Sequence, residues 1–216
     1  MIASRQNSQV MQLCGPGSPS LISMSLASAI SDAFFDVTGR HSGGLVRSYR
    51  TDDAETIVVA LGSVLGTIKD AVDLRRDAGD RIGVVGITTF RPFPNDAVRT
   101  ALEGSRHVVV IEKAFSAGVG GVLSSEVAMA LHGTNCDVRS VVAGLGGRAI
   151  TRRSLEELLT SAVRGEIEPL TFLDLDRGAV DRERLRMTTT RRSGPSAENI
   201  LRDLAGERPL NARNSS

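Results

Sequence analysis

Three charged residues stand next to glycine- or proline-rich turns, where a side chain can reach a ligand or a partner chain. Arg91 opens the segment RPFP, Glu112 precedes the loop AFSAGVGG, and Arg148 closes the segment GLGGR. A carboxylate in a cleft can act as a general acid or base, and an arginine beside backbone amides can bind an anion such as a phosphate. The sequence therefore offers acid–base chemistry or anion binding at these turns.

Each of these turns follows a short apolar run that is typical of a buried strand. The runs are ETIVVALGS, RIGVVGITTF, HVVVIEK and DVRSVVAG, and each is followed by apolar residues at helical spacing. Repeated strand–helix units predict an α/β fold with a mostly parallel sheet and helices on both faces. Ligands bind such sheets beyond the carboxyl ends of the strands. The candidate binding or interface residues are therefore Gly62, Ser63, Arg91, Glu112, Gly118, Gly120, Gly121, Gly144, Gly146, Gly147 and Arg148.

These turns also have a structural interpretation. Tight turns between a strand and a helix need glycine, and LGSVLG does not match G-x-G-x-x-G, so a dinucleotide site is not expected. The amides of GLGGR could hold an anion with Arg148 as the counter-charge, but a purely structural turn is favoured. For Glu112 a structural or interface carboxylate is favoured, because Lys113 points to the opposite face of the strand. No residue is predicted to be catalytic.

Potential metal ligands are scattered along the chain. Cys14 and Cys136 form no C-x-x-C pair and cannot supply the four thiolates of an iron–sulfur cluster. His41, His107 and His132 fall in a linker, at a strand start and at a helix end. We predict no metal site on this chain.

The RPFP segment is interpreted as a corner of the chain. Pro92 keeps Arg91 out of the helical region and removes a donor from the sheet, so the strand must end there. Pro94 suits the first turn of the next helix, and Phe93 is expected to pack beneath the corner. Only Arg91 is left free for another role.

Composition narrows the class of protein. The chain has 216 residues, enough for one sizeable domain, and its net charge of +1 points to neither nucleic acid nor a membrane surface as a partner. No apolar stretch approaches the roughly 20 residues that span a bilayer. The start, MIASRQNSQVMQL, does not resemble a signal peptide. We expect a cytoplasmic protein.

The pattern divides the chain into three parts. Residues 1–50 are poorly patterned and are interpreted as a remnant or linker with a short helix over Leu26 to Val37. Residues 51–177 form the α/β domain, and a capping box of Ser154 and Glu157 is predicted to start its last helix. Residues 178–216 are polar and arginine-rich, which predicts a largely disordered tail.

The motifs together resemble a known family. Three segments are similar to the C-terminal part of the alpha chain of pyruvate:ferredoxin (flavodoxin) oxidoreductase and of its 2-oxoacid:ferredoxin relatives. They are the segment from SYRTDDAETIVVALGSVLG to RPFP, the segment VVVIEKAFSAGVGGVLSSEVAMAL and the segment VVAGLGGRAIT. The resemblance covers roughly residues 45–175. It implies a three-layer α/β/α domain with a five-stranded, mostly parallel sheet, like the C-terminal domain of transketolases.

The resemblance also implies a function for the complete enzyme. The family uses thiamine diphosphate and magnesium to decarboxylate a 2-oxo acid, passes electrons through iron–sulfur clusters to ferredoxin or flavodoxin, and forms an acyl-coenzyme A. This sequence has no G-D-G…N motif for magnesium diphosphate and no cluster cysteines. We therefore expect a non-catalytic subunit or fragment that binds none of these cofactors alone and is not active alone. Its expected partners are the remaining alpha-type domain, a beta chain with thiamine diphosphate, and gamma and delta chains.

Two alternatives remain open. The chain could be a stand-alone module that binds a phosphate or coenzyme A through the strand-end glycines. It could also be a decayed fragment of an alpha chain that folds without retaining a function. The sequence does not reveal which 2-oxo acid the complete enzyme uses.

Overall fold

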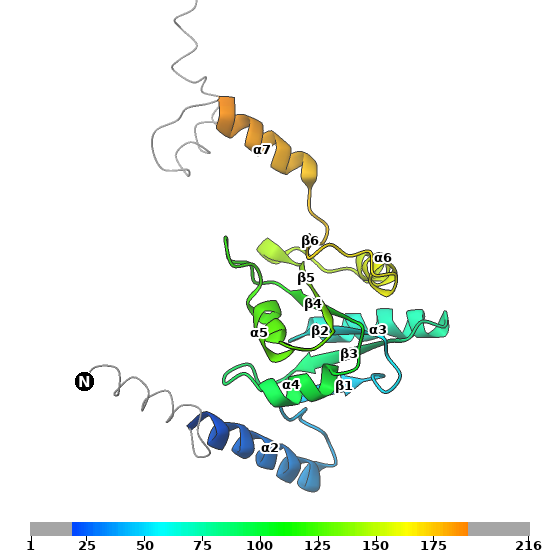
Figure 1. Cartoon of the computed structure of the whole chain (residues 1–216), viewed down its shortest axis with the longest axis vertical. Helices are drawn as coiled ribbons and strands as arrows, with labels where there is room; N and C mark the ends of the chain where they lie inside the picture. The colour runs from blue at the N-terminus through cyan, green and yellow to red at the C-terminus, as the bar shows by residue number, and fades with distance from the viewer. Residues whose placement is uncertain (1–18, 190–216) are drawn as a thin grey trace, which may run out of the picture. The chain divides into compact units, whose positions relative to one another are not determined.

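A six-stranded sheet forms the centre of the part of the chain that the structure describes, residues 19–189 (Figure 1). In this computed structural model the strand order is β1-β3-β2-β4-β5-β6, and β1 runs antiparallel to its neighbour while all other pairs are parallel. The strands are β1 (Val46–Tyr49), β2 (Thr56–Ala60), β3 (Ile82–Ile87), β4 (His107–Glu112), β5 (Asp137–Val142) and β6 (Leu170–Phe172). The mostly parallel sheet is confirmed.

Helices cover both faces of this sheet. α3 and α6 pack together on one face, and α4 and α5 pack together on the other. The helices are α2 (Pro19–Thr38), α3 (Val64–Asp77), α4 (Asn95–Leu102), α5 (Val122–Ala130), α6 (Arg152–Val163) and α7 (Arg177–Thr189), with a 3-10 turn, η1 (Leu145–Gly147). The three-layer arrangement expected from the sequence is therefore confirmed.

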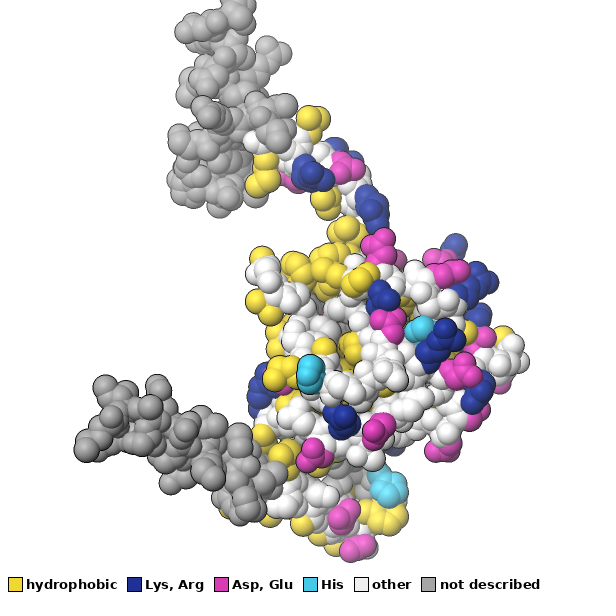
Figure 2. All heavy atoms as spheres, viewed as in Figure 1, with side chains coloured by type: hydrophobic (Ala, Val, Ile, Leu, Met, Phe, Trp, Pro, Cys, Tyr) yellow, Lys and Arg dark blue, Asp and Glu magenta, His cyan; other side chains and the backbone are white. Residues whose placement is uncertain are grey.

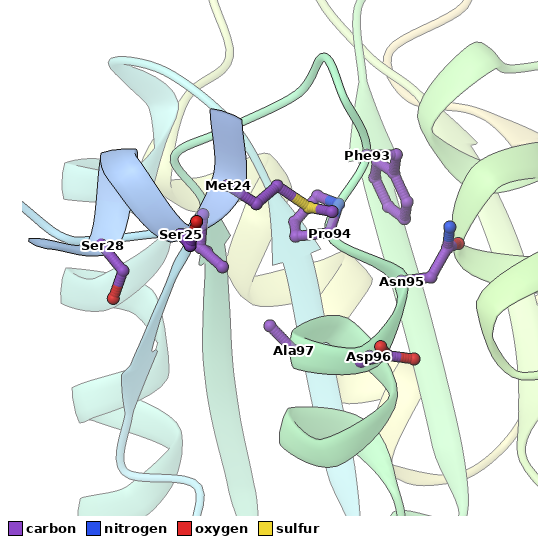
Figure 3. Close-up of a pocket in the computed structure, with 9 residues that line it drawn as sticks. Met24, Ser25, Ser28, Phe93, Pro94, Asn95, Asp96 and Ala97 are labelled. Atoms are coloured by element: carbon purple, nitrogen blue, oxygen red, sulfur yellow. The ribbon is translucent and has the colours of Figure 1, made fainter. Parts of the chain in front are cut away.

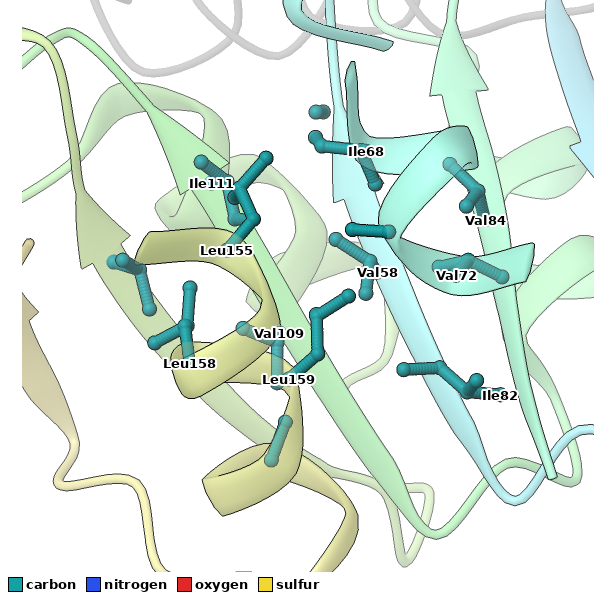
Figure 4. Packing of buried hydrophobic residues seen from close by; sticks show 14 of the residues in the cluster. Val58, Ile68, Val72, Ile82, Val84, Val109, Ile111, Leu155, Leu158 and Leu159 are labelled. Atoms are coloured by element: carbon teal, nitrogen blue, oxygen red, sulfur yellow. The ribbon is translucent and has the colours of Figure 1, made fainter. Parts of the chain in front are cut away.

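The central strands are apolar throughout because both of their faces are buried. Every residue of β2 and β3 is buried. Val58 packs under α3 and α6, whereas its neighbour Val59 packs on the opposite face with α4 and α5. Figure 4 shows Leu155 and Leu159 of α6 lying over the strands, on the same face as Ile68 of α3. Branched aliphatic side chains thus fill the core with little aromatic contribution.

The connection from β5 to β6 differs from the three before it. α3 returns the chain from β2 to β3 on one face, while α4 and α5 carry it the other way along the sheet on the opposite face, so these three units share one hand. α6 continues in the direction of α4 and α5 but lies on the α3 face. The β5–α6–β6 unit therefore has the opposite hand.

The sheet has six strands and not the five that the resemblance implied. The sequence pattern showed four strands and gave no signal for the other two, β1 and β6. β1 lies in the segment interpreted as a linker, and β6 has only 3 residues. Both are edge strands, and neither has a fully buried residue. Without two buried faces a strand needs no continuous apolar run, so the pattern gives no signal.

The predicted start of α6 is wrong by about one turn. The N-cap is Thr151, whose Oγ1 accepts a hydrogen bond from the backbone N of Ser154 at 3.1 Å. Ser154 is therefore inside the helix, and Glu157 forms an ion pair with Arg153 at 3.1 Å. Several serines and threonines near a helix start make the capping residue ambiguous in the sequence.

The segments outside the α/β body are more helical than the sequence suggests. The helix expected over 26–37 extends from Pro19 to Thr38. The segment expected to be a disordered tail begins with α7, where the Asp176 side chain accepts a hydrogen bond from Ala179 N at 2.9 Å. Such a cap supports a helix locally. Residues 190–216 and Cys14 lie outside the described residues.

Two compact units divide the chain, Met1–Asp174 and Leu175–Ser216. The first unit contains the whole sheet and α2 to α6, and the second contains α7. A separate functional boundary at residue 50, within the first unit, stays a prediction.

Arg76 at the end of α3 joins three parts of the body. Its Nε donates to the carbonyl of Ile82 at 2.6 Å, its Nη2 donates to the carbonyl of Arg50 at 2.6 Å, and its Nη1 lies 2.7 Å from a carboxylate oxygen of Asp53. The hydrogen bond from Arg76 holds the pKa of the Asp53 carboxyl below its usual range. The turn between β1 and β2 is thereby tied to α3 and to the start of β3.

This ion pair predicts an acid-dependent stability. A lowered pKa in the folded state adds stability above the unfolded pKa of about 3.9, and that stability is lost as the pH falls through the folded pKa. Asp53→Asn should therefore lower the melting temperature at pH 7, and the difference from the unaltered chain should shrink below about pH 4. Melting curves from pH 7 to pH 3 measure this difference. Glu157→Gln, in an exposed pair on α6, is the control, and a pH-independent effect of Asp53→Asn would contradict the prediction.

Candidate functional site

The structure brings all the candidate residues to the carboxyl edge of the sheet. β3, β2, β4 and β5 are consecutive neighbours and parallel, so the turns after them lie at one edge (Figure 1). Gly62 and Ser63 follow β2, Arg91 lies beyond β3, and Glu112 is the last residue of β4. Whether these residues bind anything stays a prediction.

Glu112 is buried and holds the start of α5. Its side-chain oxygens accept hydrogen bonds from the backbone N of Leu123 and of Ser124, each at 2.9 Å. These N–H groups belong to the first turn of α5, whose N-cap residue, Gly121, has no side chain to accept them. A carboxylate at this end of a helix is also favoured by the helix dipole. Glu112 therefore acts as a cap supplied by the neighbouring strand.

Gly121 is required by the same arrangement. A Cβ atom at this position would lie 1.9 Å from Glu112 Oε1 and 2.5 Å from Ser124 Oγ. No side chain fits at either distance without moving the carboxylate or the helix. The last glycine of the AFSAGVGG loop is thus explained by the close approach of Glu112.

The rest of this loop is a tight hairpin. Ser116 N donates to the carbonyl of Gly120, and Gly120 N donates back to the carbonyl of Ser116, both at 2.8 Å. Gly118 and Gly120 have positive φ values of 82° and 93°, which favour glycine. Val119 at the tip is 73% exposed. The hairpin therefore projects an apolar side chain from the edge.

The GLGGR turn follows β5 and is anchored to the end of β6. Gly144 and the two glycines of η1 have positive φ values, so the chain reverses tightly. The Nη1 of Arg148 donates to the carbonyl of Asp174. The side chain of Lys113 crosses this turn, with its Cε 3.1 Å from where a Cβ of Gly144 would lie. Arg148 thus fastens the turn to the chain after β6.

Arg91 links the corner after β3 to α5. Its Nη2 lies 2.8 Å from Glu126 Oε1, its Nη1 donates to the carbonyl of Phe90 at 2.9 Å, and its guanidinium lies 4.1 Å from the ring centroid of Phe90. Phe93 is buried below and meets Phe90 edge to face, as expected from the sequence. The peptide bond between Arg91 and Pro92 is cis.

Gly62 and Ser63 form the turn from β2 into α3. Gly62 has a φ of 80°, and a Cβ there would meet no atom within 4 Å. Ser63 is the N-cap of α3, but its side chain makes no capping hydrogen bond. Backbone geometry, and not a close neighbour, explains this glycine.

Sequence reasoning missed the residues that complete this edge. Glu126 is the partner of Arg91, and Phe115 and Phe172 pack edge to face with ring centroids 5.1 Å apart. Leu145 is 46% exposed in the GLGGR turn. One signal for these residues was present in the sequence, namely large apolar residues inside glycine-rich loops. A turn that serves only to reverse the chain does not need large apolar side chains.

Within residues 19–189 no group of three or more His, Cys, Asp and Glu residues could hold a metal ion. Within the same residues no helix combines the length and the apolar character needed to cross a bilayer. Cys136 is a free thiol whose Sγ lies 3.2 Å from the carbonyl of Ser105.

A parallel sheet covered by helices on both faces, with glycine-lined turns at its carboxyl edge, places the chain among the layered α/β proteins. Residues 54–155 match the family model described as pyruvate:ferredoxin oxidoreductase core domain II. This segment, which contains every candidate residue, is similar to the pyruvate:ferredoxin oxidoreductase family. The resemblance predicted from the motifs is confirmed.

The curated relatives are named as subunits of pyruvate synthase and of a ketoisovalerate oxidoreductase. The chain is 39% identical over 156 residues to pyruvate synthase subunit PorA of Methanosarcina barkeri, covering 68% of this chain and 38% of the relative. It is 37% identical to the PorA subunit of Methanothermobacter thermautotrophicus, over 58% of this chain and 32% of that one. Ketoisovalerate oxidoreductase subunit VorA of Pyrococcus horikoshii is 30% identical, over 60% of this chain and 34% of that one. The chain thus spans about a third of the length of these relatives.

Two solved structures are distantly similar. A split gene transketolase, described as an inactive beta4 tetramer, has a TM-score of 0.42 at 19% identity, covering 55% of this chain and 42% of that one. A 2-oxoglutarate:ferredoxin oxidoreductase from Magnetococcus marinus has a TM-score of 0.43 at 11% identity, covering 68% of this chain and 24% of that one. TM-scores this low carry no argument about fold or function.

The cap on α5 gives a direct test by mutation. Glu112→Ala leaves two buried N–H groups without a partner and should lower the free energy of unfolding by about 2 kcal/mol. Gly121→Ala should cost about 1–3 kcal/mol, because its methyl group displaces the carboxylate. In the double variant the methyl group occupies space that Glu112 has left, so the combined cost should be below the sum of the two. Urea unfolding of the three variants measures this coupling, and strictly additive costs would refute the arrangement.

Proposed function

We propose that this chain is a non-catalytic subunit of a cytoplasmic 2-oxoacid:ferredoxin oxidoreductase whose complete enzyme oxidises pyruvate or a similar 2-oxo acid. On this proposal it assembles with a second alpha-type domain, a chain that holds thiamine diphosphate, and chains that carry iron–sulfur clusters. It is inactive alone. Its role is to hold the assembly together and to shape the coenzyme A side of the active site.

The single observation that carries this proposal is the match of residues 54–155 to a core domain of the pyruvate:ferredoxin oxidoreductases. The match contains β2 to β5 and every turn of the carboxyl edge. The relatives are named as subunits, and the chain spans only part of their length. Similarity to chains that are named as subunits supports a role within an assembly.

The bonding at the carboxyl edge supports a holding role. Both oxygens of Glu112 accept bonds from α5, Arg91 is paired with Glu126, and Arg148 binds the carbonyl of Asp174. These groups stabilise turns within the chain. A general acid or base must instead reach a reacting atom, and Glu112 points at the backbone of its own chain.

The residues that the structure describes do not fit the cofactors of the complete enzyme. A magnesium diphosphate needs several oxygen ligands close together, and an iron–sulfur cluster needs thiolates. Within residues 19–189 the single thiol, Cys136, lies against backbone carbonyls, and no group of three or more His, Cys, Asp and Glu residues could hold a metal ion. We therefore place thiamine diphosphate, magnesium and the clusters on other chains, and derive no reaction step from them.

The exposed side chains of the same edge suit contact with another protein. Phe115, Val119 and Leu145 are 40%, 73% and 46% exposed on neighbouring loops, with Lys113 beside them. Figure 2 shows hydrophobic side chains gathered over this part of the body. Apolar groups with a basic residue at their margin are typical of the core and rim of a protein interface.

Gentle purification of the natural complex tests the proposal. The tagged chain, recovered from its own cells, should bring down chains that carry thiamine diphosphate and iron–sulfur clusters, at fixed stoichiometry in native mass spectrometry. The purified complex should oxidise a 2-oxo acid in the presence of ferredoxin and coenzyme A. Recovery of this chain as a lone monomer from the same cells would refute the proposal.

The isolated chain should not bind coenzyme A measurably, because on this proposal other chains complete the site. Its melting temperature should stay unchanged with coenzyme A, with inorganic phosphate as the control. Genuine one-site binding at a hundredfold excess over Kd would raise the free energy of unfolding by about 2.7 kcal/mol. A shift of that size would favour a stand-alone coenzyme A or phosphate module instead.

A further inference from the structure

The helix α2 turns its apolar side away from the body. Four of its large hydrophobic residues recur four apart and a fifth follows three residues later, so they form one stripe along the helix. This stripe, called the α2 stripe below, consists of Ile22, Leu26, Ile30, Phe34 and Val37, whose exposure ranges from 43% to 86%. An apolar helix face in water is unfavourable, which indicates that something covers it.

The opposite side of α2 is the one that meets its own chain. Met24, Ala27, Ser28 and Ser31 are partly buried, whereas the α2 stripe is exposed. At about 100° per residue, the partly buried side and the α2 stripe lie roughly 130° apart around the helix axis. The usual polarity of a surface helix is therefore reversed, with serines inward and isoleucines outward.

The contact between α2 and the body is loose. A cavity of about 420 Å³ lies between α2 and the corner after β3, lined by Met24 and Ser28 on one side and by Phe93 and Pro94 on the other (Figure 3). The hydroxyls of Ser31 and Ser42 lie 2.6 Å apart and tie the end of the helix to the following loop. So weak an inner contact does not account for a 20-residue helix, because most of a helix's stability in a protein comes from packing.

We infer that the α2 stripe docks into an apolar groove on a companion chain of the oxidoreductase assembly. The identity of that companion chain rests on the proposed function. Beyond the proposed function, the inference names the surface of this chain that makes the contact and the chemistry of the surface that receives it.

A groove suits the α2 stripe better than a flat surface does. The stripe runs along a helix segment about 24 Å long, and a groove contacts both flanks of a helix as well as one face. Contact with the flanks adds to the buried area, and a stable interface buries about 800 Å² per partner.

The charges of α2 define the rim of the groove. Within the described helix the charged residues are Asp32 and Asp36, both exposed and one turn apart on the same flank. A groove with an uncharged floor and lysine or arginine on one rim complements this pattern. A lipid surface fits less well, because helices that lie on membranes use basic residues and this helix has none.

Purification of variants from the natural host tests the inference. The tagged full-length chain is recovered unaltered, as Ile30→Arg, and as Met129→Arg, a control that places the same charge at an exposed apolar position on α5. Companion chains are identified by mass spectrometry and by their thiamine diphosphate or iron–sulfur content. Ile30→Arg should reduce their recovery at least tenfold, and Met129→Arg should not. Asp36→Lys should weaken recovery less, and its effect should fade at high salt.

The folding of each variant is checked first by circular dichroism. If Ile30→Arg lowers the helix content, Ile30→Ala replaces it and should still reduce recovery severalfold. Companions recovered equally with both Ile30 variants would overturn the docking inference and leave the proposed function intact. An unaltered chain that recovers no oxidoreductase chain would overturn both.

Two further results would overturn the choice of occupant. A dimer of the purified chain in sedimentation that Ile30→Arg dissociates would show that a second copy covers the α2 stripe. Flotation of the chain with phosphatidylcholine vesicles, lost in Ile30→Arg, would show that a lipid surface covers it. A chain that is monomeric in solution and does not float agrees with a groove on a companion chain.

Discussion

The geometry of the carboxyl edge depends on the two hydrogen bonds between Glu112 and the first turn of α5. They fix where α5 begins relative to β4 and close the loop between them at both ends. Phe115 and Val119 project from that loop, and Glu126 on α5 reaches Arg91 at the corner after β3. One buried carboxylate therefore determines the relative positions of two turns that are distant in the sequence.

This arrangement is compatible with the proposed role of the chain as a holding element. Burial of a carboxylate is costly unless hydrogen bonds compensate it, and here the helix end supplies them. A group bound in this way makes the start of α5 rigid. The carboxyl edge then offers apolar loop tips and a basic side chain, which are features of a surface between proteins. The similarity to the oxidoreductase family and the hydrogen bonding of Glu112 are thus both compatible with the proposed holding role.

Much of the α/β body could be predicted from the sequence, and the same physical reasons explain which strands and contacts could not. β2 to β5 are visible because burial on both faces makes each of them a continuous apolar run, whereas β1 and β6 are edge strands without such a run. The parallel order placed Arg91, Glu112 and Arg148 at one edge. Their bonding partners were not predictable, because they depend on side-chain directions between elements far apart in the chain. The reversed polarity of α2 was likewise invisible without the body against which it lies.

The pairing of α3 with α6 has a consequence for the nascent protein. Three strands and two α-helices separate these helices in the chain, yet together they cover one face of the sheet. While the ribosome is still adding residues before α6, Val109 and Ile111 on β4 lack part of their cover. Contacts between such distant segments slow folding and expose apolar surface in the meantime. The emerging polypeptide is therefore most vulnerable to aggregation just before its last body helix leaves the exit tunnel.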